Sequence, residues 1–448
     1  MTISPELTIP TDDGWDEARR AWNLAVDQHP TAVTHATRPE DVAAAVSYAR
    51  ERGLRVTVQA TGHAASAMGP LDDTLLVRTN RMGGARIDAD DRVARVEAGA
   101  LWGDVVERAG EHGLVALHGS SIDTGAVGYT LGGGIGWLAR LHGLACNHVR
   151  AIELVTADGE LGRVDHEHEP DLFWALRGGG GSFGIVTAME LELFELREVY
   201  AGVLFWPAEA GGEVLHAYRE WARGVPEEVT SIIRYLRLPP LPEVPEQLRD
   251  RPVIDLGLAF TGGAAEGEEL VRPLREASPP MIDTFGTMPA PDLRRLHGDP
   301  EQPVPGLTHH TLVRELTPEA ADAFIGVAGP DSGSPLTGVE LRQLGGALAR
   351  REPGQGALAT LDGEYALGAV GSLMDPARGP AIQAHLDAVV EAMAPWASER
   401  TYSNFEGRPD SDPATAFDAD TYARLRAVKA QVDPDDLFAA NLTIAPAG

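Results

Sequence analysis

Two glycine runs constrain this chain most, because each demands backbone conformations and close approaches that only glycine permits. The first run is Gly132-Gly-Gly-Ile-Gly136 and the second is Gly178-Gly-Gly-Gly-Ser-Phe-Gly184. Apolar segments flank both runs, which favours ordered loops against a core over flexible surface loops. Successive backbone N–H groups in such loops can converge on one anionic group. The runs therefore predict a ligand site built from neutral backbone donors.

Both runs also match the dinucleotide-binding fingerprint by letter, at residues 179–184 and 134–139. A Rossmann site needs a strand before the glycines and a helix after them, so that the pyrophosphate meets a helix N-terminus. Around 179–184 the predicted order is reversed, with a helix over 171–176 and a strand from Ile185 onward. The other match lacks a preceding strand, and neither run carries the Gly-Lys-Ser/Thr of a P-loop. We therefore do not expect a Rossmann site.

Charge and cysteine content exclude several classes of partner. Lys and Arg number 37 against 67 Asp and Glu, which gives a formal net charge of −30. This acidic balance disfavours nucleic acid and anionic membrane surfaces as partners. The single cysteine, Cys146, rules out an intramolecular disulfide and a thiolate-cluster metal site, and no metal site is expected. The apolar runs are too short for a membrane span, and the first residues lack a signal-peptide pattern. We expect a cytoplasmic protein.

The chain length of 448 residues suggests two or three domains. From about residue 198 to 400, prolines cluster and strand patterns alternate with amphipathic helical stretches, which indicates a second α+β domain. Hydrophobic periodicity and turn residues predict helices over 39–53, 101–111, 171–176 and 421–432. The same signals predict strands over 54–59, 74–77, 93–96, 149–157, 185–193, 253–260, 358–361 and 365–370.

His63 follows a predicted strand, in the loop Thr61-Gly-His-Ala-Ala-Ser-Ala-Met-Gly69. One interpretation is an ordinary loop histidine that makes a single hydrogen bond. The other is a nucleophilic imidazole beside glycine-rich backbone donors. The residue types alone do not decide between these interpretations.

Five motifs, in order along the chain, together resemble one known family. They are Ala60-Thr-Gly-His63, Gly128-Tyr-Thr-Leu-Gly-Gly-Gly-Ile-Gly-Trp137, Val155-Thr-Ala-Asp-Gly159, Asp171 to Thr187, and Asp433-Pro-Asp-Asp-Leu-Phe-Ala-Ala-Asn441. This combination resembles the FAD-linked oxidoreductases of the vanillyl-alcohol oxidase / p-cresol methylhydroxylase (PCMH) superfamily, and most of all the berberine-bridge-enzyme-like branch. The resemblance covers nearly the whole chain and is densest between residues 38 and 190.

The resemblance implies an α+β fold in which a two-lobed PCMH-type FAD-binding domain surrounds an inserted substrate domain. The substrate domain would be an antiparallel sheet covered by helices. Residues 1–197 would form the FAD-binding domain, residues 198–399 the substrate domain, and residues 400–448 a segment that returns to the FAD-binding domain.

The resemblance also assigns cofactor-binding roles, position by position. His63 matches the histidine that bonds covalently to the 8α carbon of the flavin. Ser121 stands where doubly linked members carry a cysteine, so one linkage, through His63, is expected. Ile185 and Val186 match contacts to the adenine end. The remaining cofactor contacts would be Gln59, Ala60, Thr61, Gly62, Ala64, Met68, Gly69, Ser120, Thr124, Gly128, Tyr129, Gly132, Gly133, Gly134, Gly136, Trp137, Gly184, Asn404 and Asn441.

Two departures from the family pattern concern the reaction itself. Phe405 stands where several relatives have a tyrosine that serves as the catalytic base, and phenylalanine cannot accept a proton. Tyr365 is our first candidate for a replacement base, followed by Tyr402, His310 and Glu364. The second departure is Thr124, which lies at the position that gates the approach of oxygen, where small or branched apolar residues are usual.

The implied activity is an FAD-dependent oxidoreductase that moves a hydride from a substrate C–H bond to flavin N5. The substrate would be an alcohol or amine of a sugar or secondary-metabolite-like small molecule. Oxygen would reoxidise the flavin and yield hydrogen peroxide. One alternative is a dehydrogenase that uses another electron acceptor, and a more distant one is a flavin-binding protein without turnover. The sequence does not indicate an oligomeric state.

Overall fold

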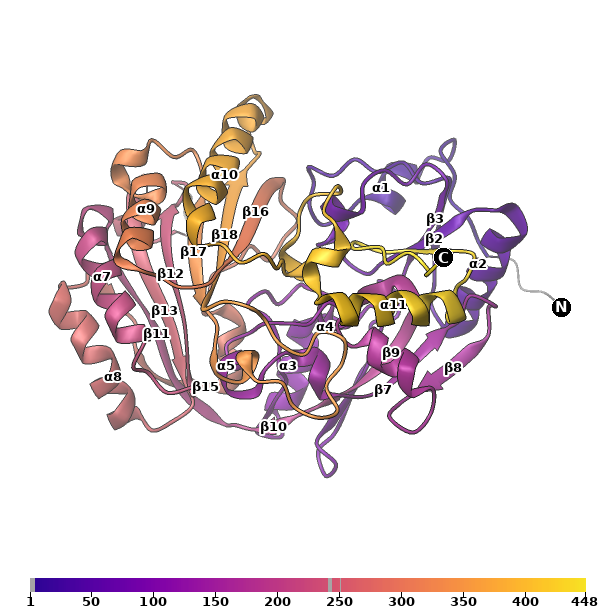
Figure 1. Ribbon diagram of the computed structural model, residues 1–448, viewed down its shortest axis with the longest axis horizontal. Helices are drawn as coiled ribbons and strands as arrows, with labels where there is room; N and C mark the ends of the chain where they lie inside the picture. Colours follow the sequence, from indigo (N-terminus) through magenta and orange to yellow (C-terminus); the bar gives the residue numbers. More distant parts are fainter. Residues whose placement is uncertain (1–4, 241–243, 250) are drawn as a thin grey trace.

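The computed structural model describes residues 5–240, 244–249 and 251–448. The first four residues, on which the expected lack of a signal peptide partly rests, lie outside the described residues. Figure 1 shows two lobes side by side. The middle of the sequence forms one lobe, and the N-terminal part joins the C-terminal segment in the other. Within the described part of the chain, no helix is both long and apolar enough to cross a membrane.

A small parallel sheet lies in the lobe that holds both ends of the chain. Its strands are β1 (Ala32–His35), β2 (Arg55–Gln59), β3 (Thr74–Arg78) and β19 (Phe438–Ala439). The order is β1-β3-β2-β19, so the C-terminal segment completes a sheet begun near the N-terminus. In open α/β sheets, ligands bind beyond the carboxyl ends of parallel strands. The loop after β2, which contains His63, starts at this edge.

Helix α2 (Pro39–Arg52) packs against this sheet and shows how the local sequence sets its limits. Pro39 opens the helix, and Glu40 and Asp41 in the first turn complement the helix dipole. Gly53 ends it with φ of 65°, a left-handed conformation that glycine adopts without steric cost. The helix predicted over 39–53 is therefore confirmed.

A second sheet in the same lobe is antiparallel, with the order β4-β5-β9-β7-β8. Gly184 directly precedes its central strand, which places the second glycine run at the sheet edge. Its strands are β4 (Ala85–Asp88), β5 (Val93–Glu97), β7 (Val149–Val155), β8 (Leu161–Val164) and β9 (Ile185–Glu192). The lobe also contains a short pair, β6 (Leu114–Val115) and β10 (Phe194–Glu195). Its helices are α1 (Trp15–Arg19), α3 (Trp102–Gly110), α4 (Ala126–Leu131), α5 (Ala139–His142), α6 (Pro170–Leu176) and α11 (Ala419–Val432).

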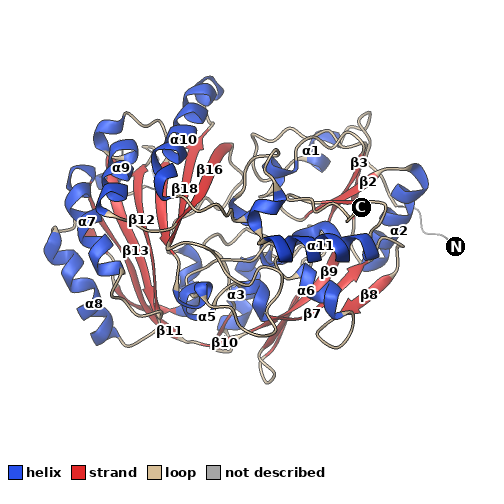
Figure 2. Cartoon of the chain, in the orientation of Figure 1, coloured by secondary structure: helices blue, strands red, loops and turns tan. Residues whose placement is uncertain are grey.

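The other lobe is one eight-stranded antiparallel sheet. Its strands are β11 (Glu198–Pro207), β12 (Val229–Arg237), β13 (Pro252–Phe260), β14 (Ile282–Asp283), β15 (Gly286–Pro289), β16 (Gly306–Val313), β17 (Gly338–Gln343) and β18 (Tyr365–Ser372). The order is β14-β11-β13-β12-β17-β18-β16, with β15 also paired to β11. Helices cover one face of this sheet: α7 (Gly211–Ala222), α8 (Ala264–Ala277), α9 (Pro318–Ala328) and α10 (Gly379–Met393). Figure 2 shows these helices on the side away from the first lobe.

The two faces of the large sheet differ in chemistry. Residues that point to the helices, such as Ile233, Leu256 and Leu341, are apolar and fully buried. The opposite face turns toward the first lobe, where a Cβ on Gly257 would come within 3.2 Å of the Trp137 ring. The α+β fold with a helix-covered antiparallel sheet is therefore as predicted. The large sheet takes all its strands from between Glu198 and Ser372.

One predicted strand is wrong. Residues 358–361 form an extended segment that pairs with no strand. Its backbone instead bonds to loops and helix ends, since Leu358 N–H donates to Arg177 O and Leu361 N–H donates to Leu348 O. Leu358 packs over the glycine runs, where a Cβ on Gly178 would lie 2.3 Å from the Leu358 Cβ. The apolar pattern of the segment therefore reflects burial between loops.

Candidate cofactor and substrate site

His63 lies in the loop that follows β2, in a conformation that three neighbours fix. Gly62 has φ of 85° and sits against Ala21, where a Cβ would meet atoms at 3.0 Å. The Trp22 ring stacks on the His63 imidazole, with centroids 4.3 Å apart and planes inclined by 22°. Thr61 Oγ1 lies 2.7 Å from His63 Nδ1. The segment around Trp22 thus covers the loop, which the sequence did not indicate.

Asp123 approaches the other side of the imidazole. Its Oδ1 lies 3.5 Å from His63 Nε2. The Ser121 hydroxyl donates to Oδ1 at 2.8 Å, and the Trp22 indole N–H donates to Oδ2. Although burial works against ionisation, these contacts hold the pKa of Asp123 below its usual value. Asp123 is therefore a half-buried carboxylate close to His63, and sequence reasoning missed it.

Side chains of the C-terminal segment pack closely against the first glycine run. A Cβ on Gly132 would lie 1.9 Å from Asn404 Oδ1, and a Cβ on Gly133 would lie 3.0 Å from the Tyr402 ring. Gly134 N–H donates to Tyr402 Oη at 2.8 Å. The close approach that these glycines permit is thus made by protein side chains. By contrast, Gly128 on α4 borders free space, because it is exposed and has nothing within 4 Å of a built Cβ.

The second glycine run leaves open space beside the C-terminal segment. Gly180 has φ of 77°, and the nearest atom to a Cβ there is Asn441 Oδ1 at 4.0 Å. A Cβ on Gly181 would lie 3.7 Å from the Ala440 Cβ. Gly184 is different, because its φ of 158° and the Leu154 side chain at 2.6 Å leave no room for a side chain. Gly180 and Gly181 therefore form a cradle floor next to Asn441.

Arg78 supplies a buried positive charge at the same sheet edge. It ends β3 and donates to Gln59 Oε1 at 3.0 Å and to Ala60 O at 3.2 Å. Burial lowers the pKa of Arg78 to about 10. Its Nε has no hydrogen-bond partner among the described residues, and no ion pair to a carboxylate is found for it there. A buried cation without a counter-charge beside the His63 loop fits a cofactor that carries phosphate groups.

The remaining predicted cofactor residues fall into two groups. Residues 59–69 and 119–136 meet, because a Cβ on Gly125 would lie 3.3 Å from the Ala60 Cβ. Asn404 and Asn441 join them, through bonds from Asn404 Nδ2 to Tyr129 O and from Asn441 Nδ2 to Ser403 O. Several other predicted residues contact protein atoms. Met68 Sδ contacts Gln59, Trp137 packs on the large sheet, and a Cβ on Gly136 would collide with His118 O. Ile185 and Val186 lie in two separate apolar cores. The other predicted residues lie on the loops and on helix α4 described above. They are Thr61, Gly62, Ala64, Gly69, Ser120, Ser121, Thr124, Gly128, Gly132, Gly133, Gly134 and Gly184.

The structure corrects the first candidate for the base. Tyr365 points into the apolar core beneath the helices, with its ring 6.3 Å from the Tyr218 ring. Burial and the neighbouring Tyr218 hold the pKa of Tyr365 well above its usual value. Neighbouring Ala366 belongs instead to the core of the first lobe, so the alternation of the strand turns Tyr365 away from the site. Glu364 is exposed and near Glu315, which also removes it from the site.

Tyr402, His310 and Phe405 do lie together between the lobes. Tyr402 is fully buried and its oxygen accepts two hydrogen bonds, from Gly134 N–H and from Asn404 Nδ2. Burial raises the pKa of Tyr402, so this phenol keeps its proton. Tyr402 N–H donates to His310 Nε2 at 3.4 Å, and the His310 and Phe405 rings are 6.3 Å apart. Burial lowers the pKa of His310 to about 4, which makes the imidazole neutral and weakly basic.

A row of charged side chains crosses the face of the large sheet that turns toward these residues. Strand register places Asp255 beside Arg234, and Arg234 beside Glu340. Arg234 holds Asp255 through two hydrogen bonds, at 2.9 and 2.5 Å. Beyond Glu340 the register continues through Gly368, which has no side chain, to the neutral imidazole of His310. Sequence reasoning missed this row, although charged residues within otherwise apolar strands were its visible signal.

His297, in a loop of the same lobe, connects that loop to the charged row of the large sheet. Its Nδ1 lies 2.7 Å from Asp299, and its Nε2 lies 2.9 Å from Glu340. Since each nitrogen faces a carboxylate, both must carry a proton, which makes the ring an imidazolium. Burial and Arg234 oppose this charge, but Asp299 and Glu340 outweigh them and raise the pKa of His297. Burial opposes ionisation of Glu340 as well, yet Arg342 and His297 lower its pKa to about 2.

These shifts predict a pH dependence of stability. The raised pKa of His297 gives stability that is complete below about 6.5 and is lost as the pH rises through the folded-state value. The lowered pKa of Glu340 gives stability that is complete above about 4.5 and is lost as the pH falls toward about 2. We expect the melting temperature to fall between pH 6 and 9, and the fall to be smaller in His297→Gln. Parallel melting curves for the two proteins would contradict this assignment.

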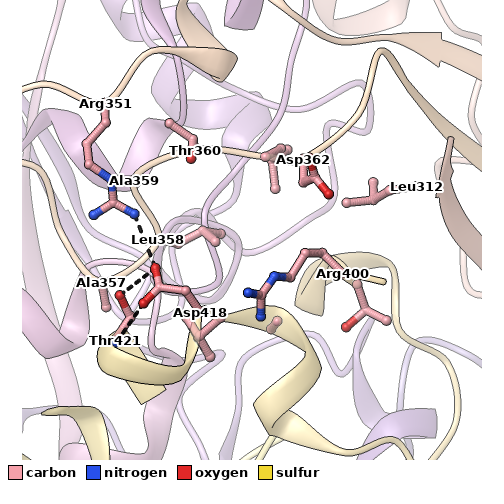
Figure 3. Close-up of a pocket in the computed structure, with 14 residues that line it drawn as sticks. Leu312, Arg351, Ala357, Leu358, Ala359, Thr360, Asp362, Arg400, Asp418 and Thr421 are labelled. Atoms are coloured by element: carbon pink, nitrogen blue, oxygen red, sulfur yellow. Dashed lines mark hydrogen bonds and ion pairs between the residues drawn. The ribbon is translucent and has the colours of Figure 1, made fainter. Parts of the chain in front are cut away.

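A pocket at the start of α11 lies outside this site (Figure 3). Arg351, Arg400, Asp418 and Thr421 are among its lining residues. Asp418 caps the helix by accepting from Thr421 N–H at 2.8 Å, and it pairs with Arg351 at 3.3 Å. None of the predicted cofactor-binding residues lines this pocket, and we assign no function to it.

Comparison with known proteins gives two family matches and several relatives. Residues 30–165 match a family described as "FAD binding domain", and residues 401–445 match one described as "Berberine and berberine like". The (R)-6-hydroxynicotine oxidase of Paenarthrobacter nicotinovorans is 27% identical over 100% of this chain and 98% of the relative. The glucooligosaccharide oxidase of Sarocladium strictum is 34% identical over 49% of this chain and 45% of the relative.

Solved structures share the whole fold. The crystal structure of 6-hydroxy-D-nicotine oxidase from Arthrobacter nicotinovorans matches with a TM-score of 0.84 at 24% identity, and covers 99% of this chain and 98% of its own. A glucooligosaccharide oxidase from Acremonium strictum, described as carrying a 6-S-cysteinyl, 8α-N1-histidyl FAD, matches with a TM-score of 0.84 at 23% identity, and covers 99% of this chain and 98% of its own. The chain thus contains a region that matches an FAD-binding domain and a C-terminal segment that matches the berberine-like family, and over its whole length it is similar to FAD-linked oxidases.

Proposed function

We propose that this protein is an FAD-dependent oxidase of small molecules, with FAD held through a single covalent bond to His63. One observation carries the proposal. The His63 loop, Arg78, Asn441 and the two glycine runs meet beyond the carboxyl ends of the parallel sheet, and the charged row of the large sheet lies across from them. The named oxidases among the relatives support the same activity.

The residues around the site fit one flavin linkage rather than two. Ser121 stands where doubly linked members have cysteine, and its hydroxyl is engaged with Asp123. Cys146 is fully buried with a pKa raised to about 12, so its thiol does not react. When bound, FAD supplies an acceptor for a hydride at N5 and passes the two electrons to dioxygen, which yields hydrogen peroxide. Arg78 and the backbone of Gly180 and Gly181 would hold its phosphate groups.

The site offers acceptors for a substrate proton, but only weak bases. Phe405 cannot accept a proton, and Tyr402 retains its own. Glu340, with its pKa lowered to about 2, can accept a hydrogen bond from a substrate O–H or N–H group but is a poor base at neutral pH. An alcohol must lose its O–H proton as the hydride leaves, whereas the lone pair of a neutral amine assists without that loss. Within the proposed class, this favours amines over alcohols.

Residues 1–197 and 400–448 would form the FAD-binding domain around a substrate domain at 198–399, which is supported by the start of β11 at Glu198. A reducing compartment is compatible with the single buried Cys146, and we propose the cytoplasm. The partners are the substrate and dioxygen.

The test is a substrate screen on the purified full-length protein. We expect a flavin spectrum, and oxygen uptake with a panel of small amines that exceeds uptake with the matching alcohols. A flavin that a donor reduces without air, but that air does not reoxidise, would identify a dehydrogenase. A flavin that no donor reduces would identify a binding protein, and a colourless protein would contradict the proposal altogether.

A further inference from the structure

The geometry points to Asp123 as the positioning residue that prepares His63 for covalent attachment to FAD, by fixing which nitrogen of the imidazole carries the proton. This inference rests on the flavin linkage proposed above. It adds a role for a residue that touches His63 and not the reacting carbon.

The imidazole has a different polar neighbour at each nitrogen. The Thr61 hydroxyl lies 2.7 Å from Nδ1, and Asp123 Oδ1 lies 3.5 Å from Nε2. The stacked Trp22 ring blocks one face and keeps the imidazole from turning over. Nε2 is buried and makes no hydrogen bond among the described residues, and the carboxylate of Asp123 is the acceptor group that lies near it.

This arrangement selects one tautomer of neutral His63. An ionised carboxylate only accepts hydrogen bonds, so Asp123 favours a proton on Nε2. Nδ1 then keeps its lone pair, toward which the Thr61 hydroxyl can donate. The pairing is the one by which a buried aspartate orients the histidine of a hydrolase triad. Nδ1 is therefore the nitrogen that keeps the nucleophilic lone pair, and the Thr61 hydroxyl turns away from it when the C–N bond forms.

The carboxylate of Asp123 is itself fixed. The Ser121 hydroxyl donates to one oxygen at 2.8 Å, and the Trp22 indole N–H donates to the other. The backbone on both sides is pinned to the start of α3, because Gly103 N–H donates to Ile122 O at 2.8 Å and Trp102 N–H donates to Thr124 O at 3.0 Å. The 3.5 Å contact between this fixed carboxylate and Nε2 is longer than an ordinary hydrogen bond, so the ring and the carboxylate must come closer for the proton to be shared.

The bond-forming step balances with the oxidant already named. A C–N bond forms between His63 Nδ1 and the 8α carbon of FAD, while one C–H bond of the 8α methyl group and the Nε2–H bond of His63 are broken. FAD gains two electrons and, through solvent, the two protons that these bonds release. Dioxygen then removes both electrons and both protons as hydrogen peroxide, which leaves oxidised, covalently bound FAD. Asp123 stabilises the positive charge that the alkylated imidazole carries until solvent takes its Nε2 proton.

The test replaces Asp123 by asparagine in the full-length protein and follows the covalent fraction of the flavin over time in air. This fraction is read as acid-insoluble flavin absorbance and as a gain of one FAD in the mass of the intact chain. We expect Asp123→Asn to bind FAD at the wild-type stoichiometry but to attach it more slowly by about tenfold or more, since losing the orienting aspartate of a triad costs up to about 10⁴ in rate. Asp123→Ala gives the same readout if the asparagine variant does not fold.

Asp27→Asn is the matched control, because Asp27 forms an exposed carboxylate–imidazole pair with His29 at 3.1 Å. It should attach flavin like the wild type. Two results for Asp123→Asn would overturn the inference: attachment at the wild-type rate, or loss of bound FAD altogether, which would mean that Asp123 only shapes the pocket. A wild-type protein without flavin would instead overturn the proposed function, so the two failures are distinguishable.

Discussion

Replacing His63 by alanine should turn a protein whose yellow colour stays in an acid pellet into one whose colour moves entirely to the supernatant. The expected change is complete, because the chain has one cysteine, and Cys146 is buried and unreactive. Ser121 lacks the thiol needed for a second bond. FAD should still bind, since Arg78, Asn441 and the glycine cradle do not depend on the imidazole. The measurement is flavin absorbance in both fractions, together with the mass of the intact chain.

His29→Ala is the control for His63→Ala, because His29 is an exposed histidine of the same lobe whose partner is Asp27. Its colour should stay with the pellet. If the His63→Ala pellet remains yellow, another residue carries the flavin and the role of His63 is wrong. If wild-type colour already moves to the supernatant, His63 is an ordinary loop residue, and the loops and Arg78 hold the cofactor without a bond.

Local sequence signals are sufficient to predict the structure of a segment wherever that segment determines its own conformation. Pro39 and Gly53 mark the ends of α2, and the apolar alternation of β2 leads directly to the His63 loop. The sequence thus places the His63 loop correctly, but residue types alone leave its chemistry open, and only the family resemblance favours a flavin linkage. The glycine runs are also identifiable, although at Gly132 and Gly134 the atoms nearest to a Cβ belong to protein side chains.

Contacts between distant segments could not be predicted. The charged row depends on the register of β12 with β13 and β17, which brings Arg234 beside Asp255 and Glu340. Register is a property of the assembled sheet, so no single strand contains it. Asp123 and Trp22 reach His63 for the same reason, since the chain must fold before these segments meet.

Tyr365 shows how small an error can remove a residue from a site. The strand that contains it was predicted correctly, but successive side chains on a strand point to opposite faces. Tyr365 therefore lies under the helices, whereas Ala366 faces the first lobe. The candidate that remains between the lobes, Tyr402, holds the glycine run in place with its hydroxyl. Residue type alone predicts neither the burial of Tyr365 under the helices nor the hydrogen bond of Tyr402 to the glycine run.

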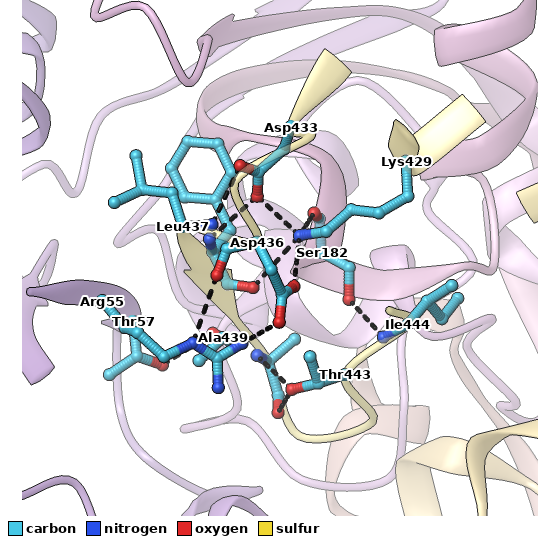
Figure 4. A network of polar contacts seen from close by, with 12 residues as sticks. Arg55, Thr57, Ser182, Lys429, Asp433, Asp436, Leu437, Ala439, Thr443 and Ile444 are labelled. Atoms are coloured by element: carbon cyan, nitrogen blue, oxygen red, sulfur yellow. Dashed lines mark hydrogen bonds and ion pairs between the residues drawn. The ribbon is translucent and has the colours of Figure 1, made fainter. Parts of the chain in front are cut away.

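Replacing Lys429 by methionine should destabilise the fold strongly. Its ammonium group is fully buried, and it donates to Asp433 at 2.6 Å, to Ser182 O at 2.8 Å and to Phe438 O at 3.3 Å (Figure 4). These contacts join α11, the second glycine run and β19. Removing one partner of a buried ion pair leaves the other charge uncompensated, which costs about 3–5 kcal/mol. We expect a lower urea midpoint and release of FAD from any non-covalent fraction.

Arg424→Met is the matched control, because Arg424 is a cation on the same helix whose ion pair with Asp171 is exposed. Exposed pairs contribute about 0–1 kcal/mol, so its urea midpoint should stay near that of the wild type. Adding Asp433→Asn to Lys429→Met should recover part of the loss, because the second change removes the uncompensated charge. If Lys429→Met unfolds at the same urea concentration as Arg424→Met, the buried network does not hold the C-terminal segment to the glycine run.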